Sequence, residues 1–489
     1  MMEIESLRAV AVGALHGVDT AIIVYFLVLN SFYAVLLLLA IPELMEHWRI
    51  SDDRNLGLLR GADVIPPISV LVPAYNEQST IVPSVLSFLT LEYPHLEVVV
   101  VNDGSTDRTM ELLIAAYELY EAPAAYPHVV PTAEIRGYYR SKVYSKLTCV
   151  DKANGGKGDS LNAALNAARF PYVLAVDADT LVERDALLRL ARPFLLGEPV
   201  AAVGGTVRVV NGSTVKHGIV TDARVDSRWL PGIQTVEYLR AFLFGRLGWN
   251  RIGGSLIISG AFGLFKQEHL QAVGGYDTGS VTEDMDVVVR LHKHLRAIGS
   301  SDAVQFIPDP VAWTEVPATL SGLHRQRERW HRGLIATLIA HRDVCFNPRY
   351  GRLGFVAYPF FLFGEMLAPA IEMLGYAAFG ASLLFGIADP EFALLFLLVS
   401  VGFGFLLSLW ATVLEEVSFR RYPGMRDFLL LVWFSVIESF GYRQLMVLFR
   451  LQSYWKYLRG DRRWGSMERE GFITAADNPV DTFQPSGRY

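Results

Sequence analysis

The residues best suited to chemistry form an acidic cluster in the second half of the chain, where Glu283, Asp284 and Asp286 place three carboxylates within four positions. An apolar run begins directly after them, at Val287. Acidic side chains that follow Thr282 are typical of a helix N-terminus, where they offset the helix dipole. A positioned carboxylate, here Asp284, can also act as the base that takes a proton from a hydroxyl group. Both interpretations fit the local sequence.

Further acidic residues stand at the ends of predicted strands. The runs 68–72 and 96–101 are short and rich in β-branched residues, and helical stretches follow them at 79–89 and 109–120. This alternation predicts a parallel sheet with helices on both faces, and in such sheets ligands bind at the carboxyl ends of the strands. The side chains expected at those ends are Asn76, Glu77, Asp103 and Asp107.

A third buried run, 172–176, ends in Asp177 and Asp179. Two carboxylates one residue apart at a strand end can bind a hard cation and a diphosphate together. Taken alone, the pair is also explained by a turn followed by a helix cap. As the third acidic strand end of one sheet, it indicates a shared ligand site.

A glycine-rich turn precedes this strand. It runs over 154–158, contains Lys157 and leads into a helix predicted for 163–169. The N–H groups at a helix N-terminus, together with a lysine, form a site for an anion such as a phosphate group. The spacing is not that of a P-loop, and an ordinary flexible turn is the alternative.

The remaining part of this region has weaker patterns. We expect a loop and an edge strand over 121–150, a strand over 200–210 and a helix over 234–248. Over 256–263 the sequence predicts a strand that runs into a turn of small residues. Such a turn lets a substrate ring approach the backbone, and close packing explains the small residues as well.

Composition places part of the chain in a membrane. Hydrophobic residues make up 52% of the 489 residues, and the mean hydropathy is +0.28. The net charge of −6 gives no indication of nucleic-acid binding. Two cysteines, Cys149 and Cys345, are too few for a disulfide framework or a zinc cage. The apolar stretches predict four membrane spans, at about 20–41, 355–387, 392–414 and 428–449.

Charged residues fall inside these predicted spans, and a basic segment precedes the second of them. Residues such as Glu365 and Arg443 within a span line a protein-enclosed path or pair with one another. The basic segment, 323–332, is typical of a juxtamembrane helix on anionic lipid. The predicted organisation is an N-terminal span within 1–50, a connector over 51–66, a catalytic domain over 67–345, a membrane region over 346–455 and a polar tail over 456–489.

Taken together, these residues resemble the membrane-embedded, processive family-2 glycosyltransferases, a group that includes cellulose, hyaluronan, chitin-oligosaccharide and poly-N-acetylglucosamine synthases. The resemblance extends from about Pro67 to the last predicted span. Five motifs stand in the family's order, which is far more specific than any one of them. They are Pro-Ala-Tyr-Asn-Glu at 73–77, Asn-Asp-Gly-Ser-Thr-Asp at 102–107, Asp-Ala-Asp at 177–179, Thr-Glu-Asp at 282–284 and Gln-Arg-Glu-Arg-Trp at 326–330.

The resemblance implies an α/β GT-A glycosyltransferase domain, with a mixed, mostly parallel sheet and helices on both faces, inserted between transmembrane helices. It implies that Asp284 is the general base and that Asp179 is the direct ligand of Mg²⁺ or Mn²⁺. Trp330 and Glu283 are implied as acceptor-binding residues. The nucleotide-sugar-binding residues that it implies are Tyr75, Asn76, Glu77, Asp103, Lys157, Asp177, Gln326 and Arg329.

The implied activity is inverting, processive transfer of a sugar from a UDP-sugar to a growing β-linked polysaccharide, with export across a bacterial-type inner membrane. The catalytic domain is expected in the cytosol. The turn at 155–159 and the short C-terminal membrane part favour UDP-N-acetylglucosamine as donor and poly-N-acetylglucosamine as product. Expected partners are the donor, the growing polymer, the lipid bilayer and export or regulatory subunits, without nucleic acid.

Other functions remain open on the sequence. A cellulose- or hyaluronan-type synthase would use the same motifs. An enzyme that transfers one sugar to a lipid carrier is less consistent with the motif at 326–330, since non-processive relatives usually lack it. A receptor or regulatory protein that binds a nucleotide sugar without turnover is less consistent with the intact set Asp177, Asp179 and Asp284.

Overall fold

The structure is a computed structural model that describes residues 2–50, 65–123, 126–216, 218–386, 390–419, 421–422 and 424–460. Most of the predicted connector at 51–66 and of the predicted tail at 456–489 lies outside the described residues. The chain divides into two compact units. The described residues of the α/β unit fall within Glu46–Asp226 and Ser255–Pro317, and those of the helical unit within Met1–Met45, Ser227–Gly254 and Ala318–Met467.

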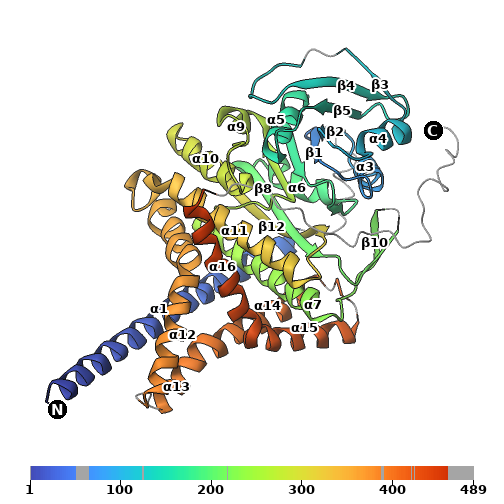
Figure 1. Ribbon diagram of the computed structural model, residues 1–489. Coiled ribbons are helices and arrows are strands. Elements are labelled where there is room, and N and C mark those ends of the chain that lie inside the picture. The colour runs from blue at the N-terminus through green and yellow to red at the C-terminus, as the bar shows by residue number, and fades with distance from the viewer. Residues whose placement is uncertain are drawn as a thin grey trace. The chain divides into compact units, whose positions relative to one another are not determined.

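A ten-stranded mixed sheet forms the centre of the α/β unit (Figure 1), in the order β3-β4-β5-β2-β1-β6-β11-β8-β12-β7. A separate hairpin consists of β9 (Thr214–Lys216) and β10 (Ile219–Asp222). The strands of the large sheet are β1 (Ile68–Ala74), β2 (Leu96–Asp103), β3 (Leu119–Glu121), β4 (Ile135–Ser141), β5 (Leu147–Lys152), β6 (Tyr172–Val176), β7 (Leu181–Val182), β8 (Val200–Val209), β11 (Phe262–Lys266) and β12 (Ala303–Thr314).

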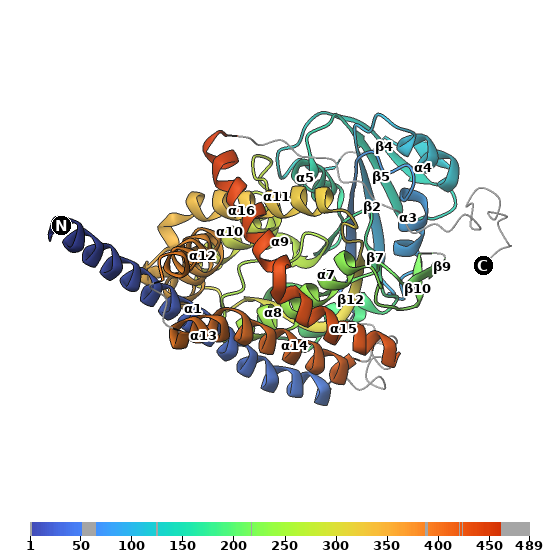
Figure 2. The same cartoon turned by 60° about the horizontal axis from the view of Figure 1, so that its bottom comes forward.

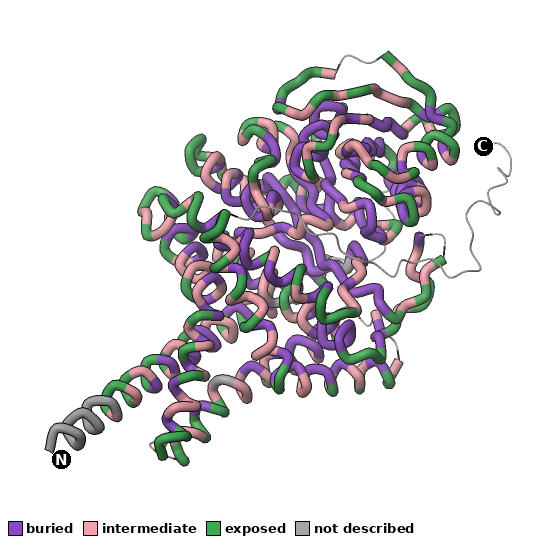
Figure 3. Tube along the Cα trace, in the orientation of Figure 1, coloured by how far each residue is buried: buried purple, intermediate pink, exposed green. Residues whose placement is uncertain are grey.

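The central strands β5, β2, β1 and β6 pair in parallel, as the alternation of strands and helices predicted. Their continuous apolar runs are buried, because helices cover both faces of the sheet (Figure 3). β1 and β2 run in register from Ile68 opposite Leu96 to Ala74 opposite Asn102. The residues that follow the two strands therefore emerge side by side at one edge of the sheet.

Helices cover the two faces, with α5 and α10 on one side and α3 and α4 on the other (Figures 1 and 2). α5 and α10 contribute Leu161 and Val288 to the same apolar core as Leu71 of β1. The helices of this unit are α3 (Ile81–Leu89), α4 (Thr109–Tyr117), α5 (Lys157–Ala167), α6 (Ala186–Leu195), α9 (Gln267–Ala272) and α10 (Glu283–Ala297).

Two local expectations were wrong, and one was correct in part. The region 121–150 contains the expected loop and a strand near the sheet edge, β4, and it also contains the start of β5, which joins the central sheet beside β2. The strand expected over 256–263 begins only at Phe262, where β11 takes its register opposite Val176 of β6. The helix predicted for 163–169 begins earlier, at Lys157, directly after the glycine turn.

The helical unit contains the long helix α1 (Met2–Ile50), whose last residues belong to the α/β unit. Residues 227–254 and 318–345, which the sequence analysis placed in the catalytic domain, pack in the helical unit. Its other α-helices are α7 (Trp229–Leu239), α8 (Gly245–Ile252), α11 (Leu320–Ala340), α12 (Ala368–Leu384), α13 (Pro390–Leu397), α14 (Phe403–Phe419), α15 (Met425–Ile437) and α16 (Arg443–Leu458).

One helix of the described chain, Val12–Trp48 within α1, is long and apolar enough to cross a membrane, and it contains the predicted span 20–41. A second candidate arises if Leu353–Met366 and Ala368–Leu384, which are bent by 46°, count as one span. The stretch 428–449 is interrupted by non-helical backbone at Phe440 and Gly441. A multi-pass arrangement therefore stays a prediction.

The charged side chains within the predicted spans have partners inside the helical unit. Glu438 pairs with Arg240 at 2.6 Å, and Glu365 accepts a hydrogen bond from Tyr33 at 2.6 Å. Arg443 lies 3.9 Å from a carboxylate oxygen of Glu372 on α12. Pairing between helices thus accounts for these residues, one of the two explanations that the sequence allowed.

A buried ionic cluster joins the last turn of α1 to the sheet within the α/β unit. Asp309 of β12 accepts from His47 at 2.9 Å and from Arg189 of α6 at 2.8 Å. Arg192 lies 3.8 Å from the same carboxylate. Burial alone would raise the pKa of Asp309, but His47 and the two arginines outweigh it and lower the pKa from 3.8 to about 2.

We expect the replacement Asp309→Asn to lower the free energy of unfolding by about 2 kcal/mol at pH 7, since the depressed pKa stabilises the folded state above the unfolded value. The stabilisation is lost as the pH falls through about 2. Denaturant unfolding at a series of pH values measures this. The difference between variant and wild type should shrink below about pH 4.

Asp222→Asn is a matched control, because its ion pair with Arg224 is about half exposed. That control should change stability by less than about 0.5 kcal/mol at any pH. A difference for Asp309→Asn that stays constant down to pH 2 would contradict the role given to this cluster.

Candidate active site

The loops that follow β1 and β2 are bonded to one another and form the first part of the site. The side-chain oxygen of Asn76 accepts from the backbone N–H of Thr106 at 2.8 Å, and the N–H of Asn76 donates to Ser105 at 3.0 Å. Asn76 has φ of 56°, a conformation that asparagine tolerates better than most residues. Tyr75 beside it is 49% exposed, so its ring is accessible to a ligand.

The residues that follow in the two motifs add further hydrogen bonds between and within these loops. The backbone N–H of Glu77 donates to Thr109 at 2.9 Å, and that of Gln78 donates to Asp107 at 3.1 Å. Asp107 also accepts from the N–H of Thr109 at 2.9 Å. The structure therefore brings Tyr75, Asn76 and Glu77 together with the acidic end of β2, as the sequence predicted.

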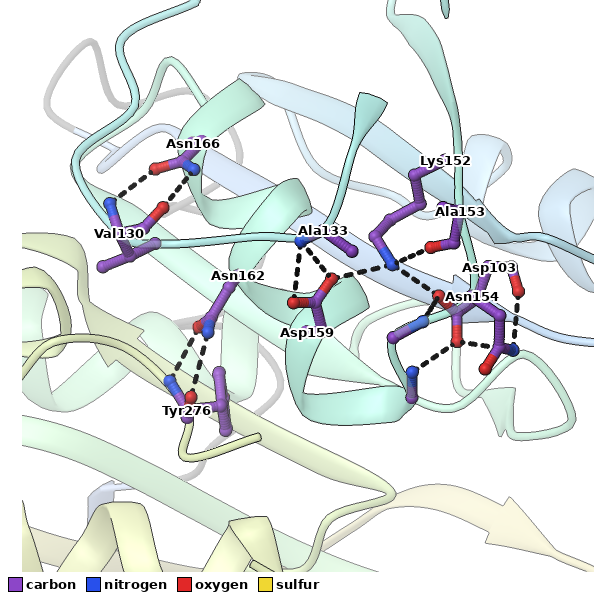
Figure 4. A network of polar contacts seen from close by, with 12 residues as sticks. Asp103, Val130, Ala133, Lys152, Ala153, Asn154, Asp159, Asn162, Asn166 and Tyr276 are labelled. Atoms are coloured by element: carbon purple, nitrogen blue, oxygen red, sulfur yellow. Dashed lines mark hydrogen bonds and ion pairs between the residues drawn. The ribbon is translucent and has the colours of Figure 1, made fainter. Parts of the chain in front are cut away.

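Asp103 is buried, and its carboxylate holds the glycine turn in place (Figure 4). It accepts from Lys152 at 2.5 Å and from the backbone N–H groups of Gly155 and Gly156 at 2.9 and 2.8 Å. Gly156 has φ of 89°, which favours glycine, and α5 begins at the next residue. Asp103 thereby fixes where Lys157 lies.

Lys152 is fully buried and connects Asp103 to α5 (Figure 4). Its ammonium lies 2.5 Å from Asp103 and 2.7 Å from Asp159. Asp159 in turn accepts from the backbone N–H of Ala133 at 3.0 and 3.1 Å. This buried cation between two carboxylates joins the end of β2, the first turn of α5 and the loop before β4.

The following turns of α5 hold two more loops (Figure 4). The amide of Asn162 accepts from the N–H of Tyr276 at 2.7 Å and donates to its carbonyl at 2.9 Å. The amide of Asn166 makes the same pair of contacts with Val130, at 3.0 and 2.8 Å. Tyr276 lies in the segment that leads into α10, which begins at Glu283. Asn162 therefore fixes the backbone that precedes the acidic cluster.

Lys157, the first residue of α5, gathers the acidic groups of the site. Its ammonium lies 2.6 Å from Asp177 and 3.2 Å from Glu283, and donates to the carbonyl of Gly260 at 3.3 Å. Burial alone would lower the pKa of Lys157, but the carboxylates of Asp177 and Glu283 raise it above its ordinary value. Lys157 is therefore a permanent cation here.

Asp284 lies in the first turn of α10, and backbone donors fix both of its oxygens. Oδ2 accepts from the N–H of Gly260 at 3.0 Å, and Oδ1 accepts from that of Met285 at 2.8 Å. A Cβ atom on Gly260 would come within 3.0 Å of Asp284 and 3.2 Å of Lys157, so the small residue permits this close approach. The side chain has the fixed orientation that a general base needs.

The helix-start interpretation of this cluster is correct in part. α10 begins at Glu283 with Thr282 as N-cap, but the Thr282 side chain makes no capping hydrogen bond. Asp286 bonds Arg290 one turn later at 2.7 Å, which is an ordinary helix pair. Glu283 is buried, and this desolvation raises its pKa even though Lys157 acts in the opposite direction.

A small cavity of about 10 Å³ lies among these groups, with Lys157, Gly260, Tyr276, Glu283 and Asp284 in its lining. That volume holds about one water molecule. The Tyr276 hydroxyl is buried and has no hydrogen-bond partner within the described part of the protein. Burial raises its pKa, so the hydroxyl stays protonated and can donate to a water or a substrate group.

The carboxylates after β6 supply the oxygen donors that Mg²⁺ or Mn²⁺ prefers. Asp179 is buried, and Asp177 contacts Lys157. In the described ranges no group of three or more His, Cys, Asp or Glu side chains is placed to hold an ion. The set fits a cation that takes one or two carboxylates and completes its shell with diphosphate oxygens.

The last motif lies in the helical unit, on α11. Gln326 is buried, Arg329 is half-buried and Trp330 is 38% exposed. The structure thus brings Lys157, Asp177, Glu283 and Asp284 together within the α/β unit, while Gln326, Arg329 and Trp330 belong to the helical unit.

Sequence reasoning missed four residues that shape this site: Lys152, Asp159, Asn162 and Tyr276. Asp159, Asn162 and Asn166 recur at helical spacing on α5, whose residues 158–167 are all buried. A buried helix with polar residues on one face requires partners, and that spacing was an available signal. Nothing in the sequence indicated Lys152 or Tyr276, because their partners are distant along the chain.

The fold and this arrangement of side chains agree with a match to a known protein family, and the match gives the class of enzyme. The family described as "Glycosyltransferase like family 2" matches residues 66–333, more than half of the chain, and the protein belongs to this family. It is a glycosyltransferase with a GT-A-like α/β fold.

Named relatives narrow the comparison. Poly-beta-1,6-N-acetyl-D-glucosamine synthase of Staphylococcus epidermidis is 31% identical over 267 residues, which is 54% of each chain. The enzyme of the same name from Staphylococcus aureus (strain COL) is 31% identical over 272 residues, or 55% of each chain. The chain spans about half the length of the curated relatives it matches.

Solved structures show more distant likeness. The mannosyltransferase PcManGT from Pyrobaculum calidifontis, in complex with GDP-Man and Mn²⁺, is 21% identical with a TM-score of 0.46, over 85% of this chain and 99% of that chain. S. aureus TarS 1–349 in complex with UDP-GlcNAc is 14% identical with a TM-score of 0.38, over 83% and 98%.

The replacement Asp284→Asn tests directly whether Asp284 is the general base. We expect kcat to fall by about 10²- to 10⁴-fold, because the amide cannot take the proton of the acceptor hydroxyl. The affinity for UDP should stay unchanged. Release of nucleoside diphosphate and equilibrium binding of UDP measure the two quantities.

Asp286→Asn is the matched control, since it makes the same chemical change two residues further along the first turn of the same helix. Its loss of the bond to Arg290 affects stability and should leave turnover of the folded enzyme within about twofold. Equal rates for wild type and Asp284→Asn would show that another group is the base.

Proposed function

We propose that this glycosyltransferase transfers N-acetylglucosamine from UDP-N-acetylglucosamine to a growing β-linked polysaccharide, with inversion at the anomeric carbon and repeated addition to the same chain. The observation that carries the proposal is the set of contacts around Lys157. Its ammonium, a permanent cation, lies 2.6 Å from Asp177 and 3.2 Å from Glu283. It also donates to the carbonyl of Gly260, and the N–H of Gly260 binds Asp284.

The chemistry follows from these groups. Asp284 takes the proton of an acceptor hydroxyl as its oxygen attacks the anomeric carbon from the face opposite the diphosphate. The bond from that carbon to the diphosphate oxygen breaks, and UDP leaves with the electron pair. A single displacement of this kind converts an α-linked donor into a β-linked product.

The leaving diphosphate gains negative charge, and Lys157 is the cation available to it in the α/β unit. Its contacts with Asp177 and Glu283 hold the ammonium until a donor provides a stronger anionic partner. Asp179 and Asp177 would hold Mg²⁺ or Mn²⁺, which when bound supplies further neutralisation of the diphosphate.

The nucleoside is expected to bind the loops that follow β1 and β2, which are hydrogen-bonded to one another. Tyr75 offers an accessible ring, the side chain of Asn76 accepts from the backbone N–H of Thr106, and the backbone N–H of Glu77 donates to the hydroxyl of Thr109. Asp103 holds the glycine turn, and one of its oxygens is proposed to accept a hydrogen bond from the nucleoside as well. Gln326 and Arg329 are proposed to bind the donor, and Trp330 and Glu283 the acceptor.

The choice of N-acetylglucosamine is supported by the named relatives, both of which are poly-beta-1,6-N-acetyl-D-glucosamine synthases. The motif at 326–330 supports repeated addition. The long apolar helix Val12–Trp48 supports a position at the membrane, where the polymer would be exported. Single transfer to a lipid carrier is the competing activity.

A panel of nucleotide sugars tests the donor. With purified full-length protein in nanodiscs, we expect UDP-N-acetylglucosamine to give at least about tenfold more diphosphate release than UDP-glucose or UDP-glucuronic acid. Omission of Mg²⁺ and Mn²⁺ should reduce release from the preferred donor. Equal rates from all donors would refute the assignment of the sugar.

The length of the product tests processivity in the same reactions. Mass spectrometry of products formed at low turnover should show long chains beside unused acceptor, because each acceptor is extended repeatedly before release. A product that carries a single added sugar would establish the lipid-carrier activity instead.

A further inference from the structure

The middle of the motif at 326–330 is buried and charged, although the resemblance gives roles only to its other residues. Arg327 and Glu328 are buried on α11, whereas Trp330 is 38% exposed. Glu328 contacts Arg332 and Lys456, each at 3.1 Å, and its carbonyl accepts from Ser453 of α16 at 3.0 Å. These contacts fasten α11 to α16.

Arg327 has a different environment. Its guanidinium donates to Glu237 of α7 at 2.6 Å, and the same carboxylate oxygen accepts from the hydroxyl of Tyr442 at 2.7 Å. Tyr442 directly follows the non-helical residues Phe440 and Gly441 that separate α15 from α16. A buried arginine needs such a partner, because an unpaired charge in the interior is costly. Glu237, which Tyr442 holds in turn, therefore anchors Arg327.

Arg327 also contacts the exposed tryptophan. Its guanidinium carbon lies 4.8 Å from the centroid of the Trp330 ring, within the range of a cation–π interaction. Residues three apart on a helix lie on the same face, so the contact follows from the spacing. A planar guanidinium that is already anchored by Glu237 restricts the rotamers of the ring it covers.

We propose that Arg327 is a positioning residue that holds one face of the Trp330 ring, so that the exposed part of the ring is presented to a sugar of the acceptor chain. The inference rests on the proposed function of Trp330 as the acceptor-binding residue. Glu237 and Tyr442 act through Arg327, since they hold the guanidinium against the indole.

The physical benefit is preorganisation. An exposed tryptophan with free rotation must be ordered before it can stack on a sugar ring, and the loss of that freedom weakens binding. When Arg327 already holds the ring, this rotational freedom is lost on folding and not on binding of the sugar. Removal of the guanidinium should therefore weaken acceptor binding, while donor binding and the rate of the chemical step stay unchanged.

The test uses initial rates of the full-length protein in nanodiscs, with saturating UDP-N-acetylglucosamine and a varied concentration of a short β-linked N-acetylglucosamine oligosaccharide. For Arg327→Met we expect the KM for the oligosaccharide to rise roughly threefold to tenfold, with the KM for the donor unchanged. Arg327→Lys retains the charge but not the plane, and its KM should be intermediate.

Two further variants separate this inference from the proposed function. Trp330→Ala should raise the KM for the oligosaccharide at least as much as Arg327→Met does, and the double variant should add little to Trp330→Ala alone. If Trp330→Ala leaves that KM unchanged, the acceptor role of Trp330 is wrong and the inference falls with it. If Trp330→Ala raises it and Arg327→Met does not, only the inference is overturned.

A matched control distinguishes positioning from general destabilisation. Arg240 makes an ion pair of the same length, 2.6 Å, with Glu438 in the same unit. Arg240→Met should lower stability without a change in the KM for the oligosaccharide. An equal rise in that KM for Arg240→Met and Arg327→Met would overturn the proposal.

Discussion

Lys157 carries a positive charge that the α/β unit surrounds with carboxylates, and the geometry of the site depends on that charge. Burial of an ammonium without partners costs on the order of several kcal/mol. Asp177 and Glu283 offset this cost, and they are thereby drawn to one point from β6 and α10. Repulsion among the acidic groups would otherwise open the site, so the lysine both assembles the carboxylates and supplies a cation for a leaving diphosphate.

The position of this charge is set by α5, which acts as a buried polar support. Asp103 and Lys152 fix the turn before the helix, and Asn162 bonds the backbone of Tyr276 in the segment that leads into α10. Each contact links segments far apart along the chain, so a displacement of α5 would move several parts of the site together. Mostly apolar helices would bury equal area without fixing these loops, because hydrophobic contacts lack direction.

Much of this could be predicted from sequence, for identifiable reasons. β2 was predicted because its run of valines is apolar on both faces, and the start of α10 because acids after Thr282 are a local pattern. The role of Asp284 came from the family resemblance, not from that pattern. The bounds of β4, within the region where an edge strand was expected, could not be predicted, because its partly exposed tyrosines and arginines give no apolar alternation. The contact between Asn162 and Tyr276 joins residues that no spacing rule connects, and the early start of α5 depends on the positive φ of Gly156.

Lys157 is expected to move when a donor binds, and a high-resolution structure of the full-length protein with bound UDP and Mn²⁺ would test this movement most directly. We predict that the ammonium of Lys157 leaves Asp177 and lies within hydrogen-bond distance of a diphosphate oxygen, while α5 and the contact between Asn162 and Tyr276 keep their positions. A structure in which UDP is bound and Lys157 still contacts Asp177, with no contact to the diphosphate, would contradict the account.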